Sequence, residues 1–195
     1  MKTARSFDTR KLVLLALLTA IIVVLQSLAA AFPIYPFTLT LVLVPIVIGA
    51  ALTGPLAGSW LGFVFGLVVL LSGNANIFLS LNPAATISVV LLKGILSGLA
   101  AGGVYKLFES KNRTIATVAA AVVSPIVNTG IFIIGSYVFF MPVVMGFSEV
   151  FGYNNATAII FLGFVGINFP LELAVNLILS PVIVRLIQYG QDRRK

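Results

Sequence analysis

Residues 43–66 read LVPIVIGAALTGPLAGSWLGFVFG, a stretch without a charged side chain in which Gly54-Pro55 separates two apolar runs. Proline lacks a backbone donor and glycine relaxes the backbone, so this pair indicates a junction between two helices. Apolar runs divided by Pro, Gly and Asn continue along most of the 195 residues, of which 60% are hydrophobic and 9% charged. Soluble domains are about a quarter charged. The composition therefore predicts an integral membrane protein.

The apolar runs predict six membrane spans, because one span needs about 20 apolar residues. We expect an all-α membrane protein with a single domain over residues 1–195. Residues 156–167 are expected to form an external lid or re-entrant segment, and Asn168 to cap the last helix. The second run is short for a span. The predicted spans are 12–32, 38–53, 55–72, 84–108, 114–140 and 169–188.

Basic residues are confined to three parts of the chain. Eleven of the twelve Lys and Arg residues precede the first span, surround the fourth-to-fifth connection, or end and follow the sixth span; Lys93 is the exception. Six spans would place these three parts on one side of the membrane. Since cytoplasmic loops carry the Lys and Arg excess, both termini are predicted to be cytoplasmic. The net charge of +7 then reflects topology and not nucleic-acid binding.

The chain has few groups suited to catalysis. It contains no Cys and no His, which removes thiol chemistry and the commonest metal ligand. Phosphate-binding loops and nucleophile motifs are also absent from the sequence. We expect no enzymatic activity, no bound metal and no bound cofactor. An intramembrane enzyme that uses Lys93 or Glu172 as a base is the alternative.

Small residues recur at four-residue spacing, which places them on one face of a helix. Such a row lets a second helix approach closely in lipid. Two interpretations are open: the rows pack inside the bundle, or an outer row binds a separate membrane subunit. The rows are Gly54, Gly58, Gly62 and Gly66 in the third span, Gly94, Gly98 and Gly102 in the fourth, and Ala16 and Ala20 in the first.

Polar side chains at membrane depth form a second group. A charge in hydrocarbon is costly, so Lys93 in the fourth span and Glu172 in the sixth are functional-site candidates. We expect both to reach one cavity that opens to the exterior. Either they form a structural ion pair, or Lys93 also binds a ligand carboxylate while amides bind hydroxyl or amide groups. The predicted binding residues are Lys93, Asn128, Glu172, Asn176, Asn168, Asn82 and Thr129.

Three segments resemble one known family: the helix junction at residues 43–58, residues 61–66 and the Ala16-x-x-x-Ala20 motif. They are similar to the S components, the substrate-binding subunits, of energy-coupling factor (ECF) vitamin transporters. The resemblance covers essentially the whole chain and is greatest for the pantothenate-specific S components. A pyridoxine or hydroxymethylpyrimidine S component and a stand-alone secondary transporter are the alternatives.

This resemblance implies a protein of the bacterial cell membrane that binds its vitamin from the outside. It also implies docking on a membrane coupling subunit (EcfT-like), through the first three helices. Two cytoplasmic ATPases would use ATP on behalf of the complex. The docking residues that the resemblance implies are Ala16, Ala20, Gly58 and Gly62.

Overall fold

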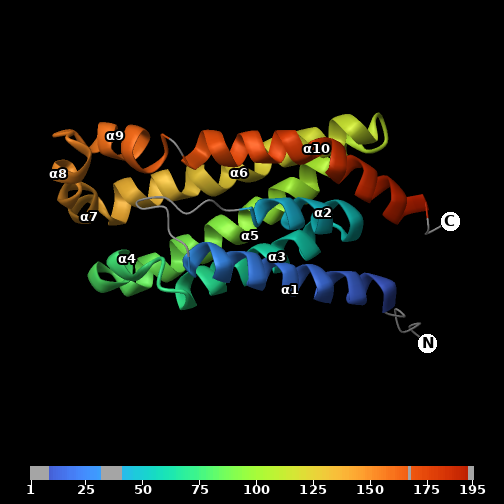
Figure 1. The fold of residues 1–195 in the computed structure, drawn as a ribbon, viewed down its shortest axis with the longest axis horizontal. Helices are drawn as coiled ribbons and strands as arrows, with labels where there is room; N and C mark the ends of the chain where they lie inside the picture. Colours follow the sequence, from blue (N-terminus) through green and yellow to red (C-terminus); the bar gives the residue numbers. More distant parts are fainter. Residues whose placement is uncertain (1–8, 32–40, 167, 193–195) are drawn as a thin grey trace.

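The computed structural model describes residues 9–31, 41–166 and 168–192, and its regular elements are all helical within these ranges. The longer helices α1, α2, α3, α5, α6 and α10 run roughly along a common axis, and the shorter ones gather at one end (Figure 1). We call that end the loop end, and the opposite end, where α1 begins and α10 finishes, the terminal end. The elements are α1 (Thr9–Ala31), α2 (Leu43–Thr53), α3 (Pro55–Leu71), α4 (Asn76–Leu81), α5 (Pro83–Phe108), α6 (Arg113–Phe139), α7 (Met141–Gly146), α8 (Ser148–Phe151), α9 (Ala156–Ala158), the π-helical turn η1 (Ile159–Phe164) and α10 (Asn168–Asp192).

Four stretches of the described chain are long and apolar enough to cross a membrane unaided: α1, α5, α6 and Ala156–Tyr189. Most helix ends lie within a few residues of the predicted spans. The main difference is α2, which begins at Leu43 where the sequence predicts a start at 38; positions 38–40 lie outside the described residues. At 11 residues, α2 is about 16 Å long. This is roughly half of the hydrocarbon thickness of a bilayer.

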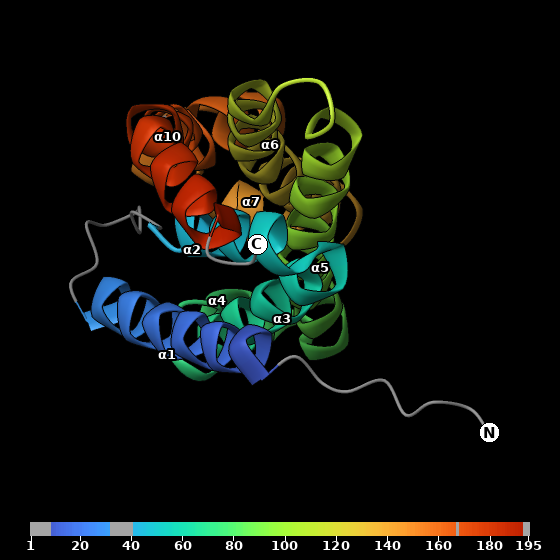
Figure 2. The ribbon, with the colours of Figure 1, turned by 90° about the vertical axis from the view of Figure 1, so that its right-hand side faces the viewer.

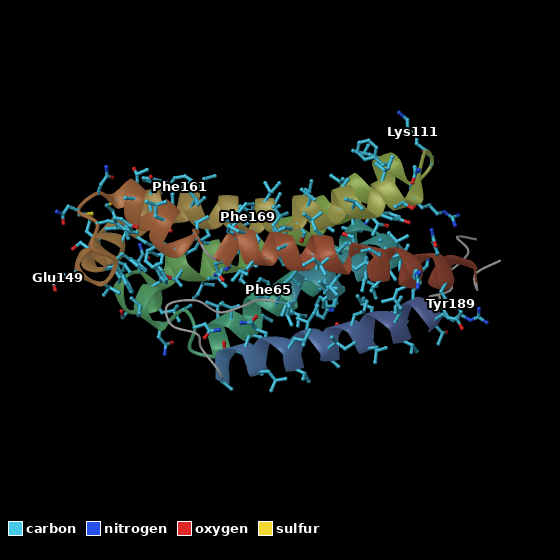
Figure 3. The ribbon with its side chains drawn as sticks, turned by 45° about the horizontal axis from the view of Figure 1, so that its top comes forward. Phe65, Lys111, Glu149, Phe161, Phe169 and Tyr189 are labelled. Atoms are coloured by element: carbon cyan, nitrogen blue, oxygen red, sulfur yellow. The ribbon has the colours of Figure 1, made fainter. Side chains whose placement is uncertain are left out.

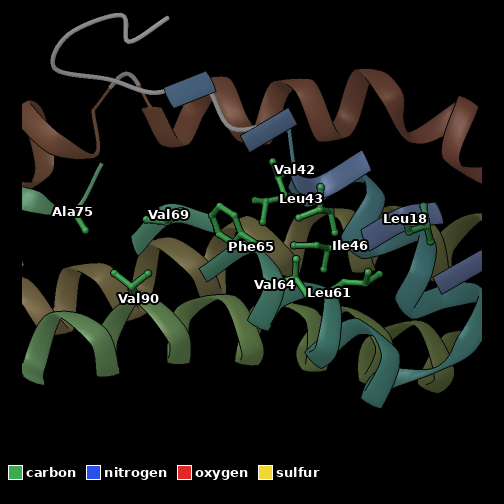
Figure 4. Close-up of a cluster of buried hydrophobic side chains, with 11 residues drawn as sticks. Leu18, Val42, Leu43, Ile46, Leu61, Val64, Phe65, Val69, Ala75 and Val90 are labelled. Atoms are coloured by element: carbon green, nitrogen blue, oxygen red, sulfur yellow. The ribbon is translucent and has the colours of Figure 1, made fainter. Parts of the chain in front are cut away.

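The short α2 is surrounded by protein. Eight of its eleven residues are buried, and it lies between the α1–α3 side and the α6–α10 side of the bundle (Figure 2). Its Leu43 and Ile46 pack with Leu18 of α1 and Leu61 of α3 (Figure 4). Irregular backbone is tolerated at membrane depth only where protein covers it. The neighbours of α2 therefore allow a helix that does not span the bilayer by itself. Its other side packs against a second cluster that includes Ala101, Ala116, Ala120 and Ala121.

The antiparallel pair α3 and α5 makes direct backbone contact through glycines. Gly58 lies opposite Gly98, and Gly62 lies opposite Gly94. A Cβ atom at either α3 position would collide with the facing carbonyl group. Both α3 glycines are buried inside the bundle. This favours the interpretation that the α3 row packs inside the bundle, and partner docking through Gly58 and Gly62 stays a prediction.

The outer face of α1 is different. Ala16 and Ala20 are both exposed, beside the exposed side chains of Val13, Leu17 and Val24. The opposite face of α1 is buried against α2 and α3. Partner docking on Ala16 and Ala20 stays a prediction, and the surface that it requires is accessible in this chain.

The loop end contains more helix than the sequence predicts. Residues 72–83 include α4, and 141–155 include α7 and α8, where we expected loops. Residues 156–164 form α9 and η1, and the buried Ile159 and Ile160 of η1 pack with Val144 of α7. The Tyr137 hydroxyl of α6 also donates a hydrogen bond to Thr157 Oγ1 at 2.9 Å. These contacts join residues 156–164 to α6 and α7. The external lid or re-entrant segment expected over 156–167 stays a prediction, and residue 167 lies outside the described residues.

Candidate functional site

A cavity of about 370 Å³ lies in the half of the bundle toward the loop end. Its walls come from α1, α3, α4, α5, α6 and α10, and residues of the 147–165 segment complete it. Two of the lining residues, Phe65 of α3 and Phe169 of α10, are labelled in Figure 3, between Glu149 at the loop end and Tyr189 at the terminal end. The volume lies in the range of about 300–1,000 Å³ that is common for small-molecule sites.

Lys93 and Glu172 supply the formal charges of the lining. Lys93 Nζ lies 5.6 Å from the ring centroid of Phe65 and 5.9 Å from that of Phe132. Cations within about 6 Å of a ring face are attracted to its π electrons. The Glu172 side chain is 4% exposed and lies near enough to act electrostatically on Lys93. The lysine is thus stabilised by two rings and a carboxyl group in a largely apolar setting.

Four side-chain amides also line the cavity, and each has one buried atom without a hydrogen-bond partner among the described residues. These atoms are Gln26 Oε1, Asn74 Nδ2, Asn128 Oδ1 and Asn168 Oδ1. Buried polar atoms are nearly always paired, and leaving one unpaired costs about 1–3 kcal/mol. These four amides therefore offer hydrogen-bonding groups at the cavity that no described residue uses.

Phenylalanine rings close the loop end of the cavity. Phe164 of η1 lies 5.1 Å from Phe147, 6.1 Å from Phe132 and 6.5 Å from Phe78, measured between ring centroids. Phe78 and Phe132 meet edge to face at 6.0 Å. All four rings line the cavity. Apolar walls with a few convergent polar groups are typical of small-molecule binding sites.

The structure brings five of the seven predicted binding residues to this cavity, namely Lys93, Asn128, Thr129, Asn168 and Glu172. Their role in binding stays a prediction. Within the described ranges, no three acidic side chains come together in a way that could hold a metal ion.

Asn82 and Asn176 lie outside the lining. Asn82 Oδ1 accepts a hydrogen bond from the backbone N–H of Ala85 at 3.1 Å, so this residue caps α5. Asn176 lies one turn after Glu172, and its Nδ2 donates to the Glu172 backbone carbonyl at 2.8 Å. These hydrogen bonds give both amides a role within their helices, although Asn176 Oδ1 is buried and has no partner among the described residues. A role of Asn82 and Asn176 in binding stays a prediction.

Asn168 is the reverse case. We expected it to cap α10, but its Oδ1 is buried and accepts no hydrogen bond from the described residues. It lines the cavity instead. The capping expectation is wrong, because the side chain points to the space between helices and not back to its own backbone.

Sequence reasoning missed Gln26, Asn74 and the phenylalanine wall. A signal existed for Gln26, which is an amide within the long apolar run 12–32. Polar side chains inside a membrane span are functional-site candidates, as we argued for Lys93. Asn74 follows Ser72-Gly73 and is typical of a turn. The rings carried no signal, since phenylalanine is expected in any membrane span.

Comparison with known proteins adds one finding. A family model described as "ECF transporter, substrate-specific component" matches residues 10–184. No curated protein and no solved structure matches the chain. The matched region includes all the residues that line the cavity. Proteins of this kind are transport components and not enzymes. The chain belongs to the family of substrate-specific components of ECF transporters.

Proposed function

We propose that this protein is the pantothenate-binding S component of an ATP-driven ECF importer of the bacterial cell membrane, and that it takes the vitamin from outside. One observation carries the proposal. Lys93 and four amides with unpaired atoms surround a single cavity of about 370 Å³.

The chemistry of pantothenate matches these groups. Its carboxylate suits the Lys93 ammonium, since charge-assisted hydrogen bonds are the stronger ones. Its two hydroxyls and its amide N–H are donors for unpaired oxygens such as Asn128 Oδ1 and Asn168 Oδ1. Its methyl groups suit the ring wall around Phe132 and Phe164. An unpaired donor, Asn74 Nδ2, is also present for an acceptor of the ligand.

Glu172 allows the lysine to be buried before the ligand arrives. An uncompensated charge in this setting would be strongly destabilising, and the Glu172 carboxylate offsets the charge of Lys93. The two interpretations of this pair then describe two states. The lysine is neutralised by Glu172 in the empty protein and also binds the ligand carboxylate in the loaded protein.

The helical arrangement supports the transport part of the proposal. Three parts of the chain lie at the terminal end: the start of α1, the end of α10 and the α5–α6 connection (Figure 1). These parts and the chain ends carry every Lys and Arg except Lys93. We place this end in the cytoplasm, with six spans if α2 and α3 are counted. Ala16 and Ala20 on the accessible face of α1 would dock on an EcfT-like coupling subunit, and two ATPases would supply energy.

The ring wall favours a second candidate ligand. Phe65, Phe132, Phe164 and Phe169 all line the cavity, and a flat heterocycle such as pyridoxine or hydroxymethylpyrimidine would stack on such rings. These compounds lack a carboxylate. Their binding would therefore depend little on the charge of Lys93.

Isothermal titration of the purified, detergent-solubilised protein tests the proposal. Lys93→Met should weaken pantothenate binding about 10- to 150-fold, because a hydrogen bond to a charged group contributes about 1.5–3 kcal/mol. Lys106→Met is the matched control, since Lys106 is exposed near the terminal end of α5. Panthenol, which has a hydroxyl in place of the carboxylate, should bind both variants alike.

Equal pantothenate affinity in the wild type and in Lys93→Met would contradict the carboxylate contact. Pyridoxine binding that Lys93→Met leaves unchanged would support the second candidate instead. Uptake into liposomes that contain this chain alone, driven by an ion gradient, would contradict the ATPase-dependent mechanism and favour a secondary transporter.

A further inference from the structure

Gln26 lies on α1, a helix to which the proposed function assigns docking and not binding. Its side chain is 2% exposed and lines the cavity. Its Oε1 has no hydrogen-bond partner among the described residues. It is thus a buried amide that points into the candidate site from a wall not yet given a role.

The inner face of α1 is otherwise apolar. Leu18, Ile22 and Gln26 are its buried residues, spaced four apart and therefore on one face. Leu18 and Ile22 pack into the hydrophobic cluster formed with α2 and α3. A third apolar side chain would extend that packing. An amide oxygen that no described residue pairs does not add to this apolar packing, so packing alone does not explain Gln26.

We infer that Gln26 is a ligand-binding residue whose Oε1 accepts a hydrogen bond from a hydroxyl or N–H group of the molecule in the cavity. The inference rests on the proposed function only in that the cavity holds the transported vitamin. It adds α1 to the helices that contact the ligand. Occupancy of the cavity then restrains the helix whose opposite face carries Ala16 and Ala20.

Two measurements on the full chain test this role. Gln26→Met keeps the length and the unbranched shape of the side chain but removes the amide, and Gln26→Leu is the second variant if the first expresses poorly. Ser27→Ala is the matched control, because Ser27 is the adjacent residue on the exposed face of α1. Titration calorimetry with pantothenate gives affinity, and thermal unfolding without ligand gives stability.

A ligand contact and a structural contact predict opposite patterns. If Gln26 binds ligand, Gln26→Met binds pantothenate about 2- to 12-fold more weakly, as expected for one neutral hydrogen bond. Its ligand-free unfolding midpoint is then unchanged or higher, because a buried unpaired atom is gone. Ser27→Ala changes neither value. Unchanged affinity in Gln26→Met, or a lower ligand-free midpoint whatever the affinity, would overturn the inference.

Failure of the proposed vitamin is distinguishable from failure of this inference. If the wild type does not bind pantothenate, the proposed substrate is wrong, and the same variants are titrated with pyridoxine and hydroxymethylpyrimidine. If none of the three binds, the ligand-free midpoint decides: a value for Gln26→Met at or above the wild type supports the inference. A midpoint below the wild type overturns it.

Discussion

Gly62→Ala tests whether the glycine row of α3 packs inside the bundle or serves a partner. Gly62 faces the backbone of Gly94 on α5, and an added Cβ would collide with the Gly94 carbonyl oxygen. It would also lie 2.5 Å from the Gly94 carbonyl carbon and 3.1 Å from the Ile95 nitrogen. All three neighbours are backbone atoms and cannot rotate away. The single methyl group must therefore separate the two helices.

The size of the effect follows from this geometry. Ordinary contact begins at 3.4 Å, so the first of these distances is about 0.9 Å too short. A gap of 0.5–1 Å forfeits about a quarter to a half of the dispersion energy of each contact along the interface. Overpacking of this kind costs about 1–3 kcal/mol. Alanine regains about 0.5–1 kcal/mol through its helix preference, which leaves a net loss of at most about 2.5 kcal/mol. Because the overlap is with backbone atoms, we expect the upper part of this range.

Thermal unfolding followed by circular dichroism in one detergent measures this loss. Gly103→Ala on α5 is the matched control, because nothing lies within 4 Å of its added Cβ. It gains the helix preference without a clash and should be slightly more stable than the wild type. Gly62→Ala should have a lower midpoint than both proteins.

Equal or higher stability of Gly62→Ala would refute the reasoning. That result, combined with reduced transport by the assembled complex, would return Gly62 to a docking surface. Loss of stability in the isolated chain is the outcome that only internal packing produces.

Three further substitutions separate structural roles from binding and docking roles. Asn82→Ala should lower stability by about 1 kcal/mol through loss of a helix cap and leave pantothenate affinity unchanged; a tenfold weaker affinity would return Asn82 to the binding site. Replacing Ala16 and Ala20 with Trp should abolish uptake by the assembled transporter while calorimetry still shows binding, and lost binding would mean that these alanines pack internally. Ser97→Ala removes the buried 2.8 Å hydroxyl contact to Ser124 that joins α5 to α6. The free energy of unfolding should fall by about 1–3 kcal/mol, and an unchanged unfolding midpoint would contradict this structural role.

Hydrophobic runs predicted the longer helices because their ends coincide with Pro, Gly and charged residues. They failed at the start of α2, where Leu41 and Val42 are as apolar as the helix that follows. Hydropathy has no signal for a helix that begins inside an apolar run. The position of that start depends on burial by α1, α3 and α10, which a single sequence does not report.

Two asparagines show what local sequence does not decide. Asn82 and Asn168 each precede a proline by one or two residues, and both are suited to capping a helix. Asn82 caps α5, whereas the Asn168 side chain turns to the cavity. The preference for a cap is the same at both positions. The surrounding helices therefore determine whether the side chain caps its helix or faces the cavity.

Four-residue spacing likewise identifies a helix face without identifying its neighbour. The row at Gly58 and Gly62 meets α5, whereas Ala16 and Ala20 are exposed on α1. Glycine allows direct backbone contact and alanine only close approach. That difference in size is the one sequence feature that separates the two rows.

Packing differs between the two halves of the bundle, and this difference explains how a stable helical protein retains a cavity. Toward the terminal end, small residues such as Ala101, Ala116 and Ala120 let α2, α5 and α6 pack closely. Toward the loop end, the same long helices carry phenylalanines and amides that leave a cavity and several unpaired polar atoms. We therefore expect the half with the cavity to be the less stable one, as is common for ligand sites. Because a ligand that pairs those atoms binds the folded state alone, at 100 times its Kd it stabilises the protein by about 2.7 kcal/mol. We expect this stabilisation to act mainly on the half that contains the cavity, because the unpaired atoms lie there.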